Sequence, residues 1–251
     1  MKDVAAVILA AGKGKRMKSK LRNKVVLTLA ERPMIGYTVE NLEKAKISII
    51  VVVVGFQKDS VQEVLKTRVS YVYQRQRLGT AHALQQAVPL LPKKIKYVIS
   101  MYGDDSAFYP PTLFRQLYKT HLKSGAAVTV VTVEKREPAG LGRIVRDREG
   151  RIVAIIEEKN ATNSQRKITE INTGLYCFSR DFLETGIGRI KKNPVANEYY
   201  LTDIVEVAVR AGEKVEGLSW SDASIWWGVN TPDQLVVADR KMRQRRGYAH
   251  F

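Results

Sequence analysis

Short apolar runs recur along the first half of the chain, separated by segments whose apolar residues have helical spacing. The runs contain almost no polar positions, which is typical of strands buried on both faces. The predicted strands are 5–9, 47–54, 69–73, 97–101 and 127–133. The predicted helices between them are 34–45, 59–66, 80–91 and 110–124. This alternation predicts an α/β fold with a doubly wound, mostly parallel sheet.

The pattern changes after residue 133, where predicted strands follow one another more closely. A turn at 147–150 separates two short apolar segments and predicts a hairpin. Further strands are expected at 170–178, 215–220 and 225–227, with helices at 180–190, 201–211 and 231–246. We therefore expect a sheet-forming half over 1–135, a smaller β-rich insertion over 136–230, and a C-terminal helix and basic tail over 231–251. Such an insertion is suited to holding a second substrate.

The stretch Val7–Lys24 joins the first buried strand to a glycine turn and a group of cations. Glycines let a backbone approach a ligand closely, and successive free N–H groups in such a turn form a concave anion site. The spacing of a P-loop is absent, and a dinucleotide fingerprint fails because Met17 occupies the position of its third glycine. The stretch therefore indicates a polyphosphate site, with a solvated glycine turn as the alternative.

Other informative residues also follow predicted strands. The third strand ends in Tyr73-Gln74, and Gly79-Thr80 opens the next helix. The fourth strand ends in Tyr102-Gly103-Asp104-Asp105. Because ligands of open α/β sheets bind beyond the carboxyl ends of the strands, these groups predict one shared site.

Composition narrows the class of protein. A chain of 251 residues that is 45% hydrophobic can bury one sizeable α/β core. No apolar run approaches ~18 residues, so no membrane span is expected. The first strand begins at once, which leaves no room for a signal peptide, and the expected location is cytoplasmic. The single cysteine, Cys177, excludes an intrachain disulfide and is interpreted as a small buried hydrophobe.

The charge is strongly positive, with 42 Lys and Arg against 25 Asp and Glu, or +17. Such a field attracts nucleotides and phosphosugars, and also nucleic acid. The densest basic run, 240–246, lacks interleaved aromatic residues, so nucleic-acid binding is the less favoured alternative. RNA binding that depends on salt and is not displaced by a nucleoside triphosphate would favour it. His82 and His121 lack metal-like spacing and are interpreted as structural.

Eight segments, taken in order, resemble the uridylyltransferase domain of the bacterial bifunctional N-acetylglucosamine-1-phosphate uridylyltransferase/glucosamine-1-phosphate acetyltransferase family. They are LAAGKGKRM (9–17), QRQRLGTAHA (74–83), YGD (102–104), GLGRI (140–144), IIEEKNAT (155–162), EINTG (170–174), NEYYLTD (197–203) and GVN (228–230). The resemblance covers nearly the whole chain and implies a Rossmann-like nucleotidyltransferase domain over 1–230. Its halves would bind the nucleotide (1–135) and the sugar (136–230).

The resemblance implies attack by the phosphate of N-acetyl-glucosamine 1-phosphate on the α-phosphorus of UTP, with pyrophosphate leaving. Asp104 and Asn230 would hold Mg²⁺, whose preference for oxygen ligands they suit. Lys13, Arg16 and Lys24 would act on the phosphates. The nucleotide would meet Leu9, Ala10, Ala11, Gly12, Gln74, Gly79 and Thr80. The sugar would meet Tyr102, Gly103, Gly142, Glu157, Asn172, Tyr200 and Thr202.

The sequence departs from the family pattern around the metal and the sugar. The family's Leu-Pro-Lys is replaced by Leu-Arg-Asn-Lys, which puts Lys24 eight residues past Arg16 instead of seven. Asp105-Ser106 replaces an apolar residue and a proline, Leu141 replaces a common tyrosine, and Trp227 replaces a glutamate. These changes concern the substrate and leave open a glucose-1-phosphate uridylyl- or thymidylyltransferase. A non-catalytic sensor of nucleotide sugars is a separate alternative, which the presence of both Asp104 and Asn230 disfavours.

The chain ends without the hexapeptide repeats that carry acetyl transfer and trimerisation in the bifunctional enzymes. We therefore expect no acetyl transfer and a monomer or weak dimer. The sequence leaves open whether this is a stand-alone enzyme or a piece of a longer one.

Overall fold

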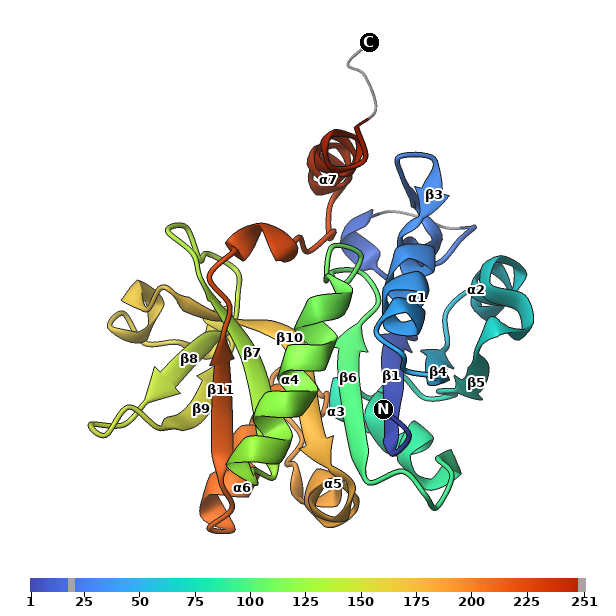
Figure 1. Ribbon diagram of the computed structural model, residues 1–251. Coiled ribbons are helices and arrows are strands. Elements are labelled where there is room, and N and C mark those ends of the chain that lie inside the picture. The colour runs from blue at the N-terminus through green and yellow to red at the C-terminus, as the bar shows by residue number, and fades with distance from the viewer. Residues whose placement is uncertain (18–20, 248–251) are drawn as a thin grey trace.

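The computed structural model describes residues 1–17 and 21–247, which form a twisted sheet with helices on both faces (Figure 1). The nine-stranded sheet has the order β11-β7-β10-β6-β1-β4-β5, and β8 and β9 extend it beside β10. Its strands are β1 (Val4–Ala10), β4 (Ile49–Val54), β5 (Ser70–Tyr73), β6 (Tyr97–Tyr102), β7 (Val128–Glu134), β8 (Arg143–Arg146), β9 (Ile152–Ile156), β10 (Glu170–Ser179) and β11 (Val215–Ser219). The predicted α/β class is confirmed.

Strands β6, β1, β4 and β5 run parallel to one another, and β11 runs parallel to β7. β10 is antiparallel to both of its neighbours, β6 and β7. The second half of the chain therefore supplies two strands, β10 and β11, to the main sheet. Among the described strands after β7, the β8–β9 hairpin lies off this path.

Alternate residues of β1 pack into two separate core layers, which explains its uninterrupted apolar sequence. Ala6 and Ile8 pack with helices α1 (Met34–Lys44), α2 (Lys58–Leu65) and α4 (Pro111–Ser124). Ala5 and Val7 pack with α3 (Thr80–Ala87), α5 (Arg180–Gly186) and α6 (Ile204–Arg210) on the opposite face. A strand buried on both faces needs apolar side chains at every position.

The register of β10 against β7 shifts between Asn172 and Tyr176. Gly174 has a φ of 76°, and a Cβ there would lie 2.5 Å from the ring of Tyr102. Only glycine fits this irregularity, where β10 passes the ring of Tyr102 at the carboxyl end of β6.

The structure differs from the predicted secondary structure in three places. The strand predicted at 225–227 is wrong, because the side chain of Asp222 accepts a hydrogen bond from the N–H of Ser224 and starts a 3₁₀ turn over Ala223–Ile225. The helix predicted to reach residue 91 ends as α3 at Ala87, where Pro89 cannot donate to a helical ladder. The hairpin β2 (Thr28–Leu29) and β3 (Arg32–Pro33) was not predicted, because Ala30 and Glu31 hold its turn with positive φ in place of the usual Asn-Gly.

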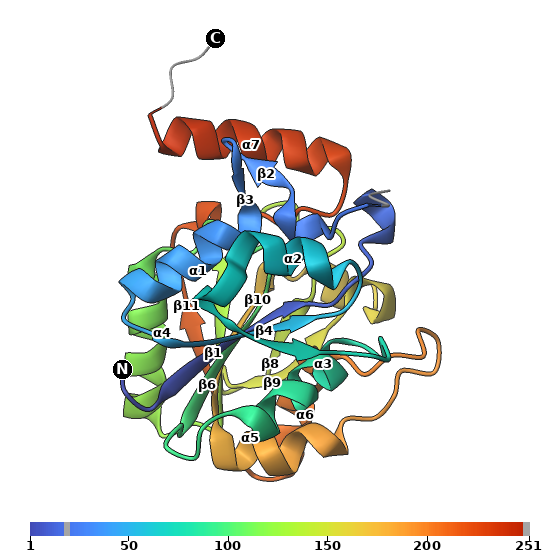
Figure 2. The same ribbon diagram turned by 90° about the vertical axis from the view of Figure 1, so that its right-hand side faces the viewer.

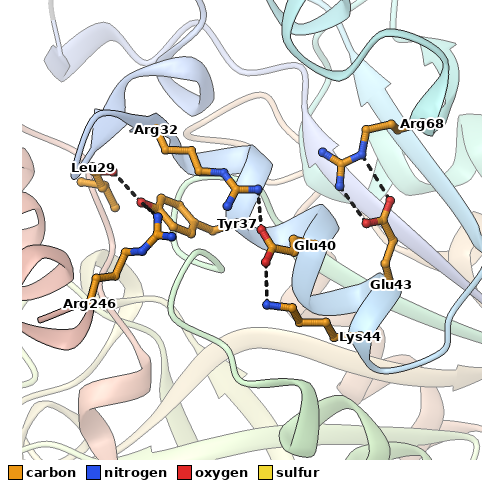
Figure 3. Close-up of polar contacts among 8 residues, drawn as sticks. All are labelled: Leu29, Arg32, Tyr37, Glu40, Glu43, Lys44, Arg68 and Arg246. Carbon is orange, nitrogen blue, oxygen red and sulfur yellow. Dashed lines mark hydrogen bonds and ion pairs between the residues drawn. The ribbon is translucent and has the colours of Figure 1, made fainter.

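The last helix, α7 (Pro232–Arg245), lies across the β2–β3 hairpin, away from the main sheet (Figure 2). Asp239 accepts a hydrogen bond from the N–H of Ala30 at 2.7 Å. Figure 3 shows a second attachment, in which the hydroxyl of Tyr37 donates to the carbonyl of Leu29 at 2.8 Å and accepts from Arg246 at 3.2 Å. The C-terminal helix is thereby fixed to α1 and the hairpin.

Residues 18–20 of the glycine stretch and 248–251 of the predicted tail lie outside the described residues. Within 1–17 and 21–247, no helix has the length and apolar character needed to cross a bilayer.

Candidate active site

A cavity of about 790 Å³ opens at the carboxyl ends of β1, β5 and β6. Its size is typical of a small-molecule site. It brings together sixteen of the residues singled out in the sequence: Leu9, Ala10, Ala11, Gly12, Lys13, Arg16, Lys24, Gln74, Gly79, Thr80, Tyr102, Asp104, Gly142, Glu157, Asn172 and Asn230. They come from both halves of the chain, so the residues predicted for the nucleotide and for the sugar share one cavity.

Three predicted site residues, Gly103, Tyr200 and Thr202, are not among the residues that line the cavity. The N–H of Gly103 donates to the carbonyl of Leu9 at 3.0 Å, which joins the ends of β6 and β1. The hydroxyl of Thr202 donates to Glu157 at 3.3 Å. The hydroxyl of Tyr200 contacts the ammonium of Lys159, which also lies 4.6 Å from the ring centroid. Thr202 therefore orients the side chain of Glu157, which lines the cavity, and Gly103 joins the backbones of β6 and β1 at their carboxyl ends.

In the lining of the cavity, one ammonium group connects the two predicted metal ligands. The Nζ of Lys24 forms an ion pair with the carboxylate of Asp104 and donates to the side-chain oxygen of Asn230 at 3.1 Å. The N–H of Val229 donates to the carbonyl of Asp104 at 3.1 Å, which brings the GVN segment to the end of β6. Lys24 thus reaches the site despite its altered spacing from Arg16.

Asn23 explains how Lys24 is positioned without the family's proline. Its side-chain amide is almost fully buried and donates to the carbonyls of Ala10 and Phe56, each at 2.8 Å. Its side-chain oxygen accepts from the N–H of Val25, capping a 3₁₀ turn that begins at Lys24. Asn23 was not among the predicted site residues, although an asparagine just before a short helical turn is a capping signal.

The donor set at Asp104 and Asn230 fits a hard divalent cation. A carboxylate oxygen and an amide oxygen both approach the same positively charged atom, the Nζ of Lys24. Mg²⁺ takes one or two carboxylates, further oxygens and phosphates in such sites. Among residues 1–17 and 21–247, no group of three or more His, Cys, Asp and Glu is arranged to hold a metal. Any cation here would therefore take further ligands from a substrate or water.

The glycine turn after β1 forms the neighbouring wall. Gly12 is exposed, with open space where a Cβ would be, so a ligand has room beside its backbone. Gly14 has a φ of 56° and lies against the side chain of Lys24, where a Cβ would approach its Cδ to 3.1 Å. Lys13 lies 5.9 Å from the ring centroid of Phe56, and Arg16 is exposed. The turn therefore presents two exposed cations that line the cavity.

The start of α3 and the NEYYLTD segment contact each other where Gly79 and Thr80 line the cavity. Gly79 has a φ of 109°, and a Cβ there would lie 2.4 Å from the carbonyl oxygen of Tyr199. The N–H of Leu201 donates to the hydroxyl of Thr80 at 2.9 Å. Glycine is therefore required where the start of α3 meets the NEYYLTD segment. Gln74 lies beside this contact, nearly buried, and its amide nitrogen donates to the Gly79 carbonyl at 3.0 Å.

The side chains predicted for the sugar are held in a network of their own. The amide of Asn172 donates to the hydroxyl of Tyr176 at 2.7 Å and accepts from the N–H of Gly174 at 3.0 Å. Burial raises the pKa of Glu157, and the hydrogen bond from Thr202 opposes that rise. The carboxyl group of Glu157 is half-buried where it lines the cavity.

Next to Asp104 lies a second carboxylate, that of Asp105, which sequence reasoning noted only as a departure. It is 7% exposed, and its Oδ1 has no hydrogen-bond partner within the described part of the chain. Burial raises its pKa well above the usual value, and the charge of Asp104 adds to the rise. No pattern in the sequence indicates that this carboxyl, rather than its neighbour, is the buried one.

The comparisons with known proteins agree with this geometry. The nucleotidyl transferase family matches residues 5–245. Bifunctional protein GlmU of Pelotomaculum thermopropionicum is 41% identical over 243 residues, which cover 97% of this chain and 53% of that protein. Bifunctional protein GlmU of Brevibacillus brevis is 40% identical over 251 residues, covering 100% of this chain and 54% of that protein. The chain spans about half the length of these curated relatives.

A solved structure supports the fold. It is assigned as a glucose-1-phosphate thymidylyltransferase from Bacillus anthracis in complex with a sucrose. It matches with a TM-score of 0.78 and 22% identity, covering 99% of this chain and 97% of that one. Since the family match takes in both the glycine turn and the Asp104–Asn230 pair, the chain belongs to the nucleotidyl transferase family.

Proposed function

We propose that this chain transfers UMP from UTP to N-acetyl-glucosamine 1-phosphate, giving UDP-N-acetylglucosamine and pyrophosphate. The observation that carries the proposal is the Lys24 ammonium, which connects Asp104 and Asn230 in the cavity that Gln74 and the glycine turn also line. Curated relatives of about 40% identity over the whole chain bear the name GlmU and support the same reaction. In this proposal, residues 1–135 bind the nucleotide and residues 136–230 bind the sugar.

The chemistry needs no general base. An anionic oxygen of the sugar phosphate attacks the α-phosphorus, a P–O bond forms, and the bond to the β-phosphate oxygen breaks. Pyrophosphate carries away the electron pair. Phosphoryl-type transfer of this kind depends on positioning and on neutralising charge. Lys13 and Arg16, which line the cavity, hold the triphosphate and stabilise the leaving pyrophosphate, and Lys24 acts between the two substrates.

Asp104 and Asn230 would hold a divalent cation, Mg²⁺ in our proposal. When bound, the cation neutralises phosphate charge and lowers the barrier to attack. The two protein oxygens would hold it at the end of β6, and phosphates and water would supply its further ligands.

Two further groups would set the substrate. Gln74, with the backbone of Gly79 and Thr80, reads the base, and the backbone of 9–12 contacts the nucleoside. Tyr102, Gly142, Glu157 and Asn172 meet the sugar. Uracil and thymine differ by one methyl group, so rejection of thymine is steric and modest, about 10–200-fold. We expect the protein to work as a monomer or weak dimer, which sedimentation tests.

Pyrophosphate release over a matrix of nucleoside triphosphates and sugar 1-phosphates tests the proposal. We expect the highest kcat/KM with UTP and N-acetyl-glucosamine 1-phosphate, weak use of dTTP, and almost no turnover with CTP, ATP or GTP. A preference for glucose 1-phosphate, or equal use of CTP or ATP, would overturn the substrate assignment. The absence of any turnover together with tight nucleotide binding would indicate a sensor.

A further inference from the structure

We infer that His82 is a positioning residue that fixes the side-chain amide of Gln74 so that only its oxygen faces the nucleobase. The cavity then selects bases that present an imide N–H, as uracil and thymine do, and rejects cytosine. This inference rests on the proposed function and concerns the base-reading part of the same cavity.

The amide of Gln74 has two N–H groups, and both have acceptors inside the protein. The nitrogen donates to the carbonyl of Gly79 at 3.0 Å and lies 2.9 Å from the Nδ1 of His82. A carbonyl oxygen only accepts, so Gly79 determines which end of the amide is the nitrogen. The side-chain oxygen of Gln74 then remains for a ligand in the cavity that this residue lines.

His82 can accept this second N–H only as a neutral ring whose proton is on Nε2. Burial lowers the pKa of His82, and a hydrogen bond with the backbone of Gln76 opposes that shift. The Nε2 proton then faces the side-chain amide of Gln86, whose nitrogen lies 3.3 Å away, so this tautomer requires that amide to turn its oxygen toward the ring. Burial therefore favours the neutral ring, and the contact with the Gln74 nitrogen assigns its proton to Nε2.

An amide held in this orientation distinguishes pyrimidines. Its oxygen accepts a hydrogen bond from the N3–H of uracil or thymine. Cytosine presents an unprotonated N3, so two acceptors would face each other and the base would lose a hydrogen bond. To read cytosine, the Gln74 amide must turn over, which places its oxygen against both the Gly79 carbonyl and the Nδ1 of His82.

Of the two acceptors that face the Gln74 nitrogen, His82 can be changed by mutation, whereas the Gly79 carbonyl belongs to the backbone. Without the Nδ1 acceptor, turning the amide sacrifices one internal hydrogen bond instead of two. We therefore expect His82 to contribute about 10-fold to the preference for UTP over CTP, the size of one net hydrogen bond. His121 offers no such function, since its Nδ1 contacts the Thr129 hydroxyl, 2.8 Å away, inside the core.

A pair of variants separates positioning from packing. His82→Leu removes the acceptor at similar volume, whereas His82→Asn keeps an oxygen near the position of Nδ1. Calorimetry without sugar 1-phosphate, so that no transfer occurs, measures the affinities for UTP and CTP. The full reaction gives KM and kcat. We expect His82→Leu to lose about 10-fold of the UTP-over-CTP ratio through KM, and His82→Asn to restore most of it.

The outcomes distinguish this inference from the proposed function. If the wild-type protein prefers UTP and His82→Leu keeps the same ratio, the positioning role is overturned while the function stands. If the wild-type protein shows no preference for UTP, both are overturned. Should His82→Leu fail to fold, ¹⁵N NMR of the wild-type His82 ring decides, because protonation of Nδ1 in the neutral ring would overturn the inference and an unprotonated Nδ1 supports it.

Discussion

The ammonium of Lys24 donates to the side-chain oxygen of Asn230 at 3.1 Å, across 206 residues of sequence. The same ammonium forms an ion pair with Asp104. A lysine therefore lies where the two oxygens would hold a divalent cation, and binding of that cation must release it. The relation makes Lys24 both a competitor of the metal and a cation available to the phosphates.

We predict that Lys24→Met strengthens metal binding while weakening catalysis. Removing the competing ammonium should lower the Mg²⁺ dissociation constant about 10-fold, or 1.4 kcal/mol. Calorimetric titration of the protein without sugar 1-phosphate measures this change. Turnover should fall at least ~10²-fold, because a charge-stabilising group is lost. Lys13→Met is the matched control, since Lys13 lies near Phe56 and should leave metal affinity unchanged. Weaker Mg²⁺ binding in Lys24→Met would contradict the competition.

Asp104→Ala should abolish the metal site without unfolding the protein. We expect turnover to fall at least ~10³-fold, about 4 kcal/mol of barrier, with the circular dichroism spectrum preserved. EDTA should have a similar effect on the wild type, and added Mg²⁺ should restore it. Full activity in EDTA, or in Asp104→Ala, would rule out this assignment.

Much of the sheet could be predicted from the sequence because burial on both faces leaves an uninterrupted apolar run. β1 is an example, with every residue buried. Because ligands of such sheets bind beyond the carboxyl ends of the strands, Gln74 and Asp104 could be predicted to share one site. The hairpin β2–β3 could not be predicted, because Ala30 and Glu31 adopt positive φ under tertiary constraint. The network around Asn172 depends on a register shift in β10, which no local pattern reports.

Asn23→Ala should test how Lys24 is positioned. The change removes the two hydrogen bonds to the carbonyls of Ala10 and Phe56 and the cap at Val25. We expect a loss of about 2–4 kcal/mol of unfolding free energy in urea, since buried acceptors lose their partners. Turnover should also fall as Lys24 loses its fixed position. Exposed Asn163→Ala is the control and should change neither quantity. Wild-type stability in Asn23→Ala would refute this account.

Asp105→Val should stabilise the fold. The carboxyl group is buried, with its Oδ1 unpartnered in the described structure. Replacing it by an apolar group of similar size removes that desolvation cost, and we expect a gain of about 1–3 kcal/mol at neutral pH by urea denaturation. Loss of stability would instead mean that the carboxyl group makes a net favourable interaction, for example with Trp226.

The last prediction concerns pH and Asp203, the residue that precedes α6. Burial raises its pKa from 3.8 to about 6, and the charges of Glu206 and Glu157 add to the rise. The folded state therefore holds this proton more tightly than the unfolded state, so the group reduces stability as pH rises through the window from about 4 to about 6. Asp203→Asn removes that cost.

We expect Asp203→Asn to match the wild type near pH 4 and to be more stable above pH 6. The gain should be about 1 kcal/mol, less than the full shift implies, because the side chain is only partly buried and solvent screens it. Urea denaturation at a series of pH values measures the difference. Asp181→Asn, at an exposed position in α5, is the control and should show no such trend. A gain that is equal at every pH, or that grows toward acid, would show that Asp203 is not the group responsible.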